Sequence, residues 1–323
     1  GLPDGGKHCV FVAGGHANNN KRDLFEAQTL GYQLAEQGTR IATGGGQLEG
    51  SMGAVHTGFI QYYLDALMAQ PAQLHRLSKT DQATLERYRD QPFEALLTSP
   101  PEAQQARLNA EALILEQPAL LERLADKGLI RRDMFYAYST DPLLKLESPN
   151  HSQPPATRYI DAGNRVLRLS RLMQAETMVA LPGGIGTDEE IIWRLRQQEE
   201  EQARHQREAD PIAATLDGPR RKLIVHDRPT RDQEPSQQGQ HAASGPFTAM
   251  LALAGVTGPE PAKAEAAEPN ANVHVVRDIE ALASLLPGPA KKPELSWRDQ
   301  VTPPLQAYAS HLRGPEASAQ QGR

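Results

Sequence analysis

The stretch LPGGIGTDEE at residues 181–190 decides how this chain is expected to fold. An apolar run from Met178 leads into it, and an amphipathic stretch from Ile191 to about Arg207 follows it. The order is therefore strand, glycine-rich turn, helix, with Thr187 expected to cap the helix. Such a turn points several backbone N–H groups at one spot, which the helix dipole makes positive. The stretch predicts an anion site suited to a phosphate, although strand-to-helix turns are often glycine-rich without any ligand.

A second glycine turn stands in the first half of the chain. Residues 7–13 and 39–43 have the pattern of short buried strands, with a helix predicted over 23–37 between them. Gly44-Gly45-Gly46 follows the second strand, and a further helix is predicted from about Gly50. This order predicts an α/β fold with a Rossmann-like parallel sheet, in which ligands bind at the carboxyl ends of the strands.

Composition narrows the class of protein. The 323 residues carry a net charge of −6, which does not favour nucleic-acid binding through phosphates. No apolar run reaches the ~18 residues of a membrane span, and residues 1–6 lack the pattern of a signal peptide. Cys9 is the single cysteine and lies in an apolar run, so we expect a buried thiol and a cytoplasmic protein. The histidines lack metal-ligand spacing, and no metal site is expected.

Two familiar nucleotide motifs are missing. The fingerprint G-x-G-x-x-G, with an acidic residue about 20 positions later, does not follow the first strand. The phosphate-binding loop G-x-x-x-x-G-K-[ST] does not occur in the chain either. We therefore expect no NAD, FAD or other cofactor, and no nucleoside triphosphatase of the P-loop type.

The remaining sequence predicts one domain over residues 1–323. Residues 60–157, rich in Ala, Leu, Gln, Glu and Arg, predict a helical insertion that serves as a dimerisation surface, a lid or bulk, with a return to the sheet near 133–140. The segment 159–174 has the pattern of a helix, and the strands of the second half are predicted at 222–226 and 273–276. Residues 287–323 are expected to form a flexible tail.

Three arginines mark the predicted helix before the opening turn. Arg165, Arg168 and Arg171 recur every third residue, so they are neighbours on the helix surface. Like charges on one face are unfavourable unless an anion or a carboxylate lies beside them. One interpretation is a ligand contact, since arginine suits phosphate and carboxylate recognition. The others are a solvated face, or pairing with the acidic residues that follow Thr187.

These motifs together resemble a known family. Pro182-Gly183-Gly184-x-Gly186-Thr187-x-x-Glu190 resembles the P-G-G-x-G-T-x-x-E motif of the LOG family, often mislabelled "lysine decarboxylase". Gly44-Gly45-Gly46 with Gly50-Ser51-Met52-Gly53 resembles that family's G-G-G-x-x-G-L-M-G. Arg168 resembles the arginine of the family's R-x-x-x-M helix. The resemblance covers about residues 7–58 and 158–286.

The resemblance implies a Rossmann-fold homodimer that hydrolyses the N-glycosidic bond of nucleoside 5′-monophosphates. It implies Glu190 as the catalytic carboxylate, with Glu189 as a second choice, and Arg168 as its partner or as a contact to the substrate. The implied phosphate contacts are Gly183, Gly184, Gly186, Thr187, Gly45 and Gly46. Further implied substrate contacts are Gly14, Gly15, Met52 and Glu189.

The chain departs from the family pattern at several positions. Ala13-Gly14-Gly15 stands where the family has G-S-S, which removes two hydroxyls, and Ser51 replaces a leucine. Arg168 stands one residue closer to the Pro-Gly-Gly than usual, so Arg165 and Arg171 are rivals for its role. The alternative function is a non-catalytic nucleotide or molybdenum-cofactor carrier of the same superfamily. Such a binder needs only the glycine turns, whereas an arginine together with Glu190 favours an enzyme.

Overall fold

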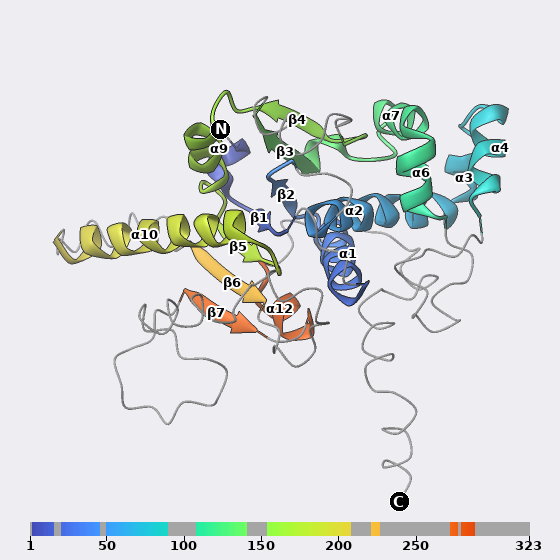
Figure 1. Cartoon of the computed structure of the whole chain (residues 1–323). Helices are drawn as coiled ribbons and strands as arrows, with labels where there is room; N and C mark the ends of the chain where they lie inside the picture. Colours follow the sequence, from blue (N-terminus) through green and yellow to red (C-terminus); the bar gives the residue numbers. More distant parts are fainter. Residues whose placement is uncertain are drawn as a thin grey trace, which may run out of the picture.

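The fold is a parallel sheet between helices (Figure 1). The computed structural model describes residues 2–15, 21–45, 50–89, 108–140, 154–207, 221–226, 272–276 and 279–287. Its strands are β1 (Cys9–Ala13), β2 (Arg40–Thr43), β3 (Phe135–Ser139), β4 (Arg158–Asp161), β5 (Thr177–Ala180), β6 (Lys222–His226) and β7 (Val273–Val276). They form a seven-stranded sheet in the order β4-β3-β2-β1-β5-β6-β7, and every neighbouring pair is parallel. The predicted Rossmann-like α/β fold is confirmed.

Helices cover both faces of the sheet, as Figure 1 shows. On one face lie α1 (Lys21–Glu36), α2 (Ser51–Met68) and α12 (Ile279–Leu285); on the other lie α9 (Arg165–Leu172) and α10 (Ile185–Arg207). The central strand β1 is buried along its whole length. Its residues alternate between the two layers: Val10 and Val12 belong to the core under α1 and α2, and Phe11 belongs to the core under α9 and α10. This explains why the strand sequence is continuously apolar.

The helical insertion is shorter than the sequence predicted. Helix α2 continues to Met68 and packs along α1, so it belongs to the sheet's covering layer. The helices outside that layer are α3 (Pro71–Leu74), α4 (Lys79–Arg87), α6 (Ala110–Glu116) and α7 (Pro118–Asp126). Short 3₁₀ turns, η1 (Pro3–Gly6) and η3 (Arg132–Met134), complete the described elements. The insertion therefore begins after Met68 rather than at residue 60, and β3 lies within the predicted return to the sheet near 133–140.

The predicted helix over 159–174 is wrong in its first part. Residues 158–161 form strand β4, which pairs with β3 at the edge of the sheet. The chain then turns through Gly163, whose φ is +77°. Helix α9 begins only after Asn164, whose side chain caps it by accepting a hydrogen bond from the Leu167 N–H at 2.9 Å.

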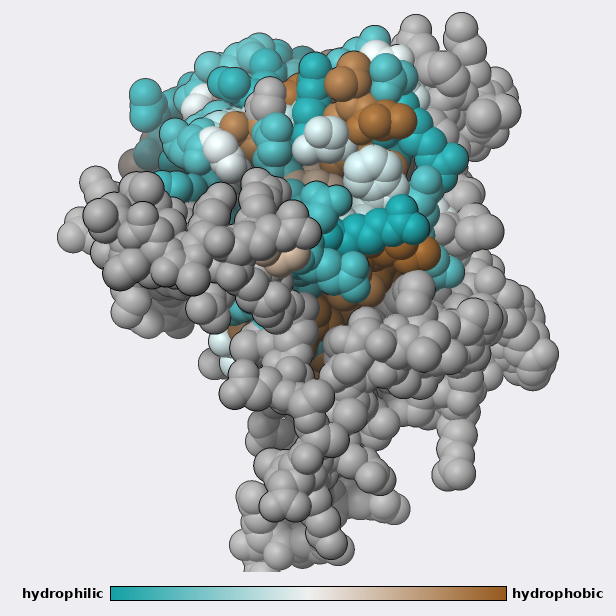
Figure 2. Space-filling model, turned by 90° about the vertical axis from the view of Figure 1, so that its left-hand side faces the viewer, coloured by the Kyte–Doolittle hydropathy of each residue, from teal (hydrophilic) through white to brown (hydrophobic). Residues whose placement is uncertain are grey.

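Apolar side chains are mostly inside the molecule. Among the described residues, the large apolar side chains that remain exposed are Leu115, Val166, Leu167 and Trp193. The face shown in Figure 2 is accordingly polar over most of its described surface, with small apolar areas. Over the described ranges, no helix combines the length and the apolar character needed to cross a membrane.

Candidate functional site

The candidate site lies where the strand order reverses. The chain runs from β1 outward to β4 on one side and then returns to β5 on the other side of β1. The carboxyl ends of β1 and β5 are tied together: the Leu181 N–H donates to the Ala13 carbonyl at 2.9 Å, and the Gly15 N–H donates to the Pro182 carbonyl at 3.1 Å. In open parallel sheets this switch point is where ligands bind. The turn that follows β5 is therefore in the expected place for a site.

The glycines of the turn after β5 stand in two kinds of surroundings. A Cβ on Gly183 would lie 2.2 Å from the Thr187 hydroxyl and 2.8 Å from the Gly15 nitrogen, so packing requires glycine there. Gly184 and Gly186 face open space, since no described atom would lie within 4 Å of a Cβ at either position. Their lack of side chains instead leaves the start of α10 accessible, and the first N–H groups of a helix have no partner within it. The turn thus has the geometry of an anion cradle.

The prediction that Thr187 caps helix α10 is wrong. The helix begins at Ile185, and the Gly184 carbonyl accepts from the N–H groups of Thr187 at 2.9 Å and Asp188 at 3.2 Å. Gly184 therefore takes the capping position. The Thr187 side chain is almost wholly buried against Gly183, which places its hydroxyl inside the turn.

Arg168 and Glu190 face each other across the site. The Arg168 Nη2 atom lies 3.4 Å from Glu190 Oε1, and only 12% and 8% of the two side chains are exposed. Arg168 comes from α9 and Glu190 from the first turns of α10. A carboxylate so deeply buried needs a partner of opposite charge. The pair places a shielded carboxylate, balanced by a guanidinium, close to the amino end of α10.

Two backbone carbonyls hold the Arg168 guanidinium in place. Its Nε donates to the Tyr138 carbonyl at 3.1 Å, at the end of β3, and its Nη2 donates to the Gly44 carbonyl at 3.3 Å, at the end of β2. A Cβ on Gly44 would lie 1.9 Å from Nη2, so only glycine at this position admits the arginine. Sequence reasoning missed the role of Tyr138, because every residue has a carbonyl acceptor and no sequence pattern marks this one.

The rival arginines have other partners. Arg165 pairs with Glu189 at a more exposed position, and Arg171 Nη1 lies 3.5 Å from the Asp161 carbonyl. Of the three arginines spaced by three, Arg168 is the one that reaches Glu190. The structure thus brings Arg168 and Glu190 together and directs Glu189 away to Arg165.

The second glycine turn lies on the other side of Arg168. Gly45 has a φ of +70°, and its N–H donates to the Thr43 hydroxyl at 3.3 Å. The Met52 sulfur lies close to the same turn, 3.4 Å from the position of a Cβ on Gly44. Gly46, predicted as a phosphate contact, lies outside the described residues. Gly14 and Gly15 are in place at the end of β1, beside the turn after β5.

Other reactive groups lie away from this site. Cys9 is fully buried, as predicted, and burial raises the pKa of its thiol to about 12, so it is not a nucleophile. Within the part of the chain that the structure describes, no group of three or more His, Cys, Asp and Glu side chains has the arrangement of a metal site.

Comparisons with known proteins add little to this geometry. No known family matches the sequence, and no curated protein matches it. Among solved structures, the molybdenum cofactor binding protein from the phototrophic bacterium Rippkaea orientalis is similar at 13% sequence identity, with a TM-score of 0.38 over 86% of this chain and 92% of that chain.

Proposed function

We propose that this chain hydrolyses the N-glycosidic bond of nucleoside 5′-monophosphates, releasing the base and ribose 5-phosphate. The observation that carries the proposal is the buried Arg168–Glu190 pair between two glycine turns at the switch point of the sheet. The proposal also rests on the resemblance of the turn at 182–190 to the LOG motif.

The phosphate is assigned to the turn after β5. The first N–H groups of α10 and the helix dipole favour a negative group there. The open space at Gly184 and Gly186 gives the phosphate oxygens room to approach the backbone. A 5′-phosphate held at this point places the ribose near the second turn of the same helix, where Glu190 lies.

Glu190 is assigned to the bond-breaking step. As the bond between C1′ and the base nitrogen breaks, its electrons leave with the base and positive charge develops on the ribose. A carboxylate held in a shielded position stabilises this charge and orients the water that attacks C1′. The departing base takes up a proton, and the water loses one.

Arg168 is assigned to holding Glu190 in position. Its Nε and Nη2 atoms are engaged by the Tyr138 and Gly44 carbonyls, which fixes the guanidinium against Glu190 Oε1. This anchoring keeps the carboxylate directed, which a catalytic role requires and a simple binding role does not. A non-catalytic nucleotide carrier, the second candidate, would need the glycine turns alone.

A panel of nucleoside monophosphates tests the proposal. The protein is incubated with each one, and free base and ribose 5-phosphate are measured. We expect hydrolysis of at least one compound, and we expect Glu190→Gln to lower kcat by at least about 100-fold while binding is largely kept. Glu189→Gln, a matched control on the neighbouring carboxylate, should remain close to the unchanged protein.

The outcomes separate the two candidate functions. Phosphate-dependent binding without release of any base would refute the enzyme and leave the carrier. Full activity in Glu190→Gln would move the catalytic role to another carboxylate. Loss of activity in Glu189→Gln alone would assign that role to Glu189.

A further inference from the structure

A second hollow lies at the opposite end of the strands from the glycine turns. Its volume is about 610 Å³, within the range of small-molecule sites. The lining residues that matter here are Glu122, Arg132, Tyr136, Thr157, Arg158 and Tyr159. Tyr136 and Arg158 pair in register near the amino ends of β3 and β4, whereas the Tyr138 carbonyl that holds Arg168 lies nearer the carboxyl ends. The hollow is therefore separate from the candidate catalytic site.

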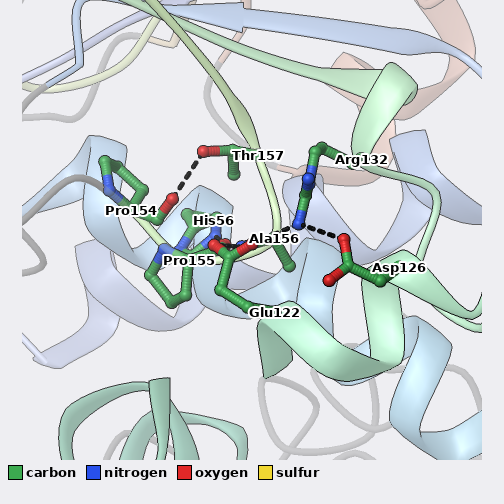
Figure 3. A network of polar contacts seen from close by, with 8 residues as sticks. All are labelled: His56, Glu122, Asp126, Arg132, Pro154, Pro155, Ala156 and Thr157. Atoms are coloured by element: carbon green, nitrogen blue, oxygen red, sulfur yellow. Dashed lines mark hydrogen bonds and ion pairs between the residues drawn. The ribbon is translucent and has the colours of Figure 1, made fainter. Parts of the chain in front are cut away.

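One wall of the hollow is a tightly held turn at residues 154–157 (Figure 3). Ala156 has a φ of +57°, a left-handed conformation that costs an alanine about 1 kcal/mol. Its N–H donates to Glu122 Oε1 at 2.7 Å, and the Thr157 hydroxyl donates to the Pro154 carbonyl at 2.7 Å. Such strain persists only where the surroundings enforce it, and it is common at functional sites.

A buried histidine on helix α2 contacts the same turn. His56 Nε2 lies 3.0 Å from the Pro155 carbonyl, and burial lowers the pKa of His56 to about 4. At neutral pH the ring is therefore uncharged and donates Nε2–H to this carbonyl. The strained Ala156, two residues before Arg158 in the sequence, is thus fixed from two sides, by α2 and by α7.

Arg158 gives one side of the hollow a positive charge. Arg132 pairs with Glu122 and also lies 3.1 Å from Asp126, so its single positive charge is shared between two carboxylates (Figure 3). Arg158 is exposed, and no ion pair joins it to any other residue that the structure describes. Burial raises the pKa of the Tyr136 phenol; the positive charges of Arg158 and Arg40 oppose that rise, and the nearby Asp133 carboxylate adds to it.

We propose that this hollow binds a small multivalent oxyanion, a phosphate ester or a polycarboxylate, with Arg158 as its counter-ion. A guanidinium presents paired N–H donors that match two oxygens of such a group, and Tyr136 and Tyr159 also line the same space. An exposed arginine on an edge strand can also serve only to prevent edge-to-edge pairing. A recess of this size, with a strained and braced wall beside the arginine, is not needed for that purpose.

Amide NMR shifts in the full chain test the proposal. Pyrophosphate and citrate are titrated separately at constant ionic strength, and the amides of residues 156–160 are followed. We expect saturable shifts with at least one of the two probes. Arg158→Gln should weaken this binding at least about tenfold, and Arg158→Glu should abolish it. Arg158→Lys keeps the charge and should retain part of the affinity. Arg76→Gln is the matched control, because Arg76 is an exposed arginine on the distant insertion.

The results have distinct meanings. A response to pyrophosphate alone identifies a phosphate ester, and a response to citrate alone identifies a polycarboxylate. Shifts that persist in Arg168→Gln show that the hollow acts independently of the glycine turns, so this outcome does not depend on the proposed hydrolase function. Absence of saturable shifts at 156–160 with both probes, or equal affinity in Arg158→Gln, would overturn the proposal.

Discussion

Replacing Gly44 by alanine should remove the proposed activity while leaving the fold almost unchanged. The added Cβ would lie 1.9 Å from Arg168 Nη2, whereas an ordinary contact needs about 3.5 Å. The guanidinium must therefore move by at least about 1.5 Å. Its bonds to the Gly44 carbonyl, now 3.3 Å, and to Glu190 Oε1, now 3.4 Å, cannot both survive that movement.

The expected effects on the reaction rate and on stability have separate causes. A misplacement of about 1 Å at a reacting group costs on the order of 100-fold in rate, or about 2.7 kcal/mol in the barrier. The atom displaced is the end of a flexible side chain, and the backbone at Gly44 lies outside the left-handed region. The backbone therefore need not move, but the buried Glu190 loses part of its pairing with Arg168, so the free energy of unfolding should fall by about 1–3 kcal/mol, or several degrees in Tm.

The assay compares kcat on the best nucleoside monophosphate with Tm for the same preparation. We expect kcat to fall about 100-fold in Gly44→Ala and Tm to fall by several degrees, with unfolding still cooperative. Wild-type kcat in this variant would refute the reasoning, because it would show that the position of Arg168 against Glu190 does not matter. A large loss of Tm would show that the added methyl group disturbs the backbone.

The remaining predictions concern stability. In Gly31→Ala the added Cβ would meet backbone and not the end of a flexible side chain, since it would lie 2.0 Å from the Val55 carbonyl oxygen of α2. We therefore expect the free energy of unfolding, measured with urea, to fall by about 1–3 kcal/mol. An unchanged midpoint would show that α1 and α2 can separate at little cost. His56 has a folded-state pKa of about 4 against 6.5 in the unfolded chain, so protonation of the unfolded state lowers stability as the pH falls from 6.5 toward 4. Between pH 6.5 and 5 this amounts to about 2 kcal/mol, with no contribution above pH 6.5. Urea unfolding of His56→Gln should lack this part of the pH dependence, and equal pH slopes in the two proteins would contradict the prediction.

The central strands and both glycine turns were predictable from the sequence. A strand buried on both faces is a continuous apolar run, and β1 and β5 have that pattern. The edge strand β4 was not recognised because two of its four residues, Arg158 and Asp161, are exposed and charged. It pairs on one side only, so its stability depends on hydrogen bonds to β3 rather than on an apolar run.

The choice among the three arginines depended on tertiary contacts. Their spacing places them on one side of a helix but cannot say which of them meets Glu190. Arg168 is directed toward Glu190 by hydrogen bonds to two backbone carbonyls. One of them, the Gly44 carbonyl at the end of β2, is 124 residues away in the sequence. In the sequence this contact is marked only by the glycine at position 44. The reason for that glycine becomes clear only when the structure shows the Arg168 side chain beside it.

The altered first loop keeps the turn after β5 in place through its backbone. The Gly15 N–H donates to the Pro182 carbonyl at 3.1 Å, and the Gly15 carbonyl accepts from the Ser51 N–H at 2.9 Å. Any side chain at Gly14 would bring a Cβ within 2.8 Å of Ser51 Cβ, so glycine at this position lets the start of α2 approach. The Ser51 hydroxyl also reaches the Pro182 carbonyl, at 3.4 Å. The position of the turn after β5 therefore does not depend on the serines that the LOG pattern has where Gly14 and Gly15 stand, and the difference concerns only direct contacts of the proposed ligand with these two residues.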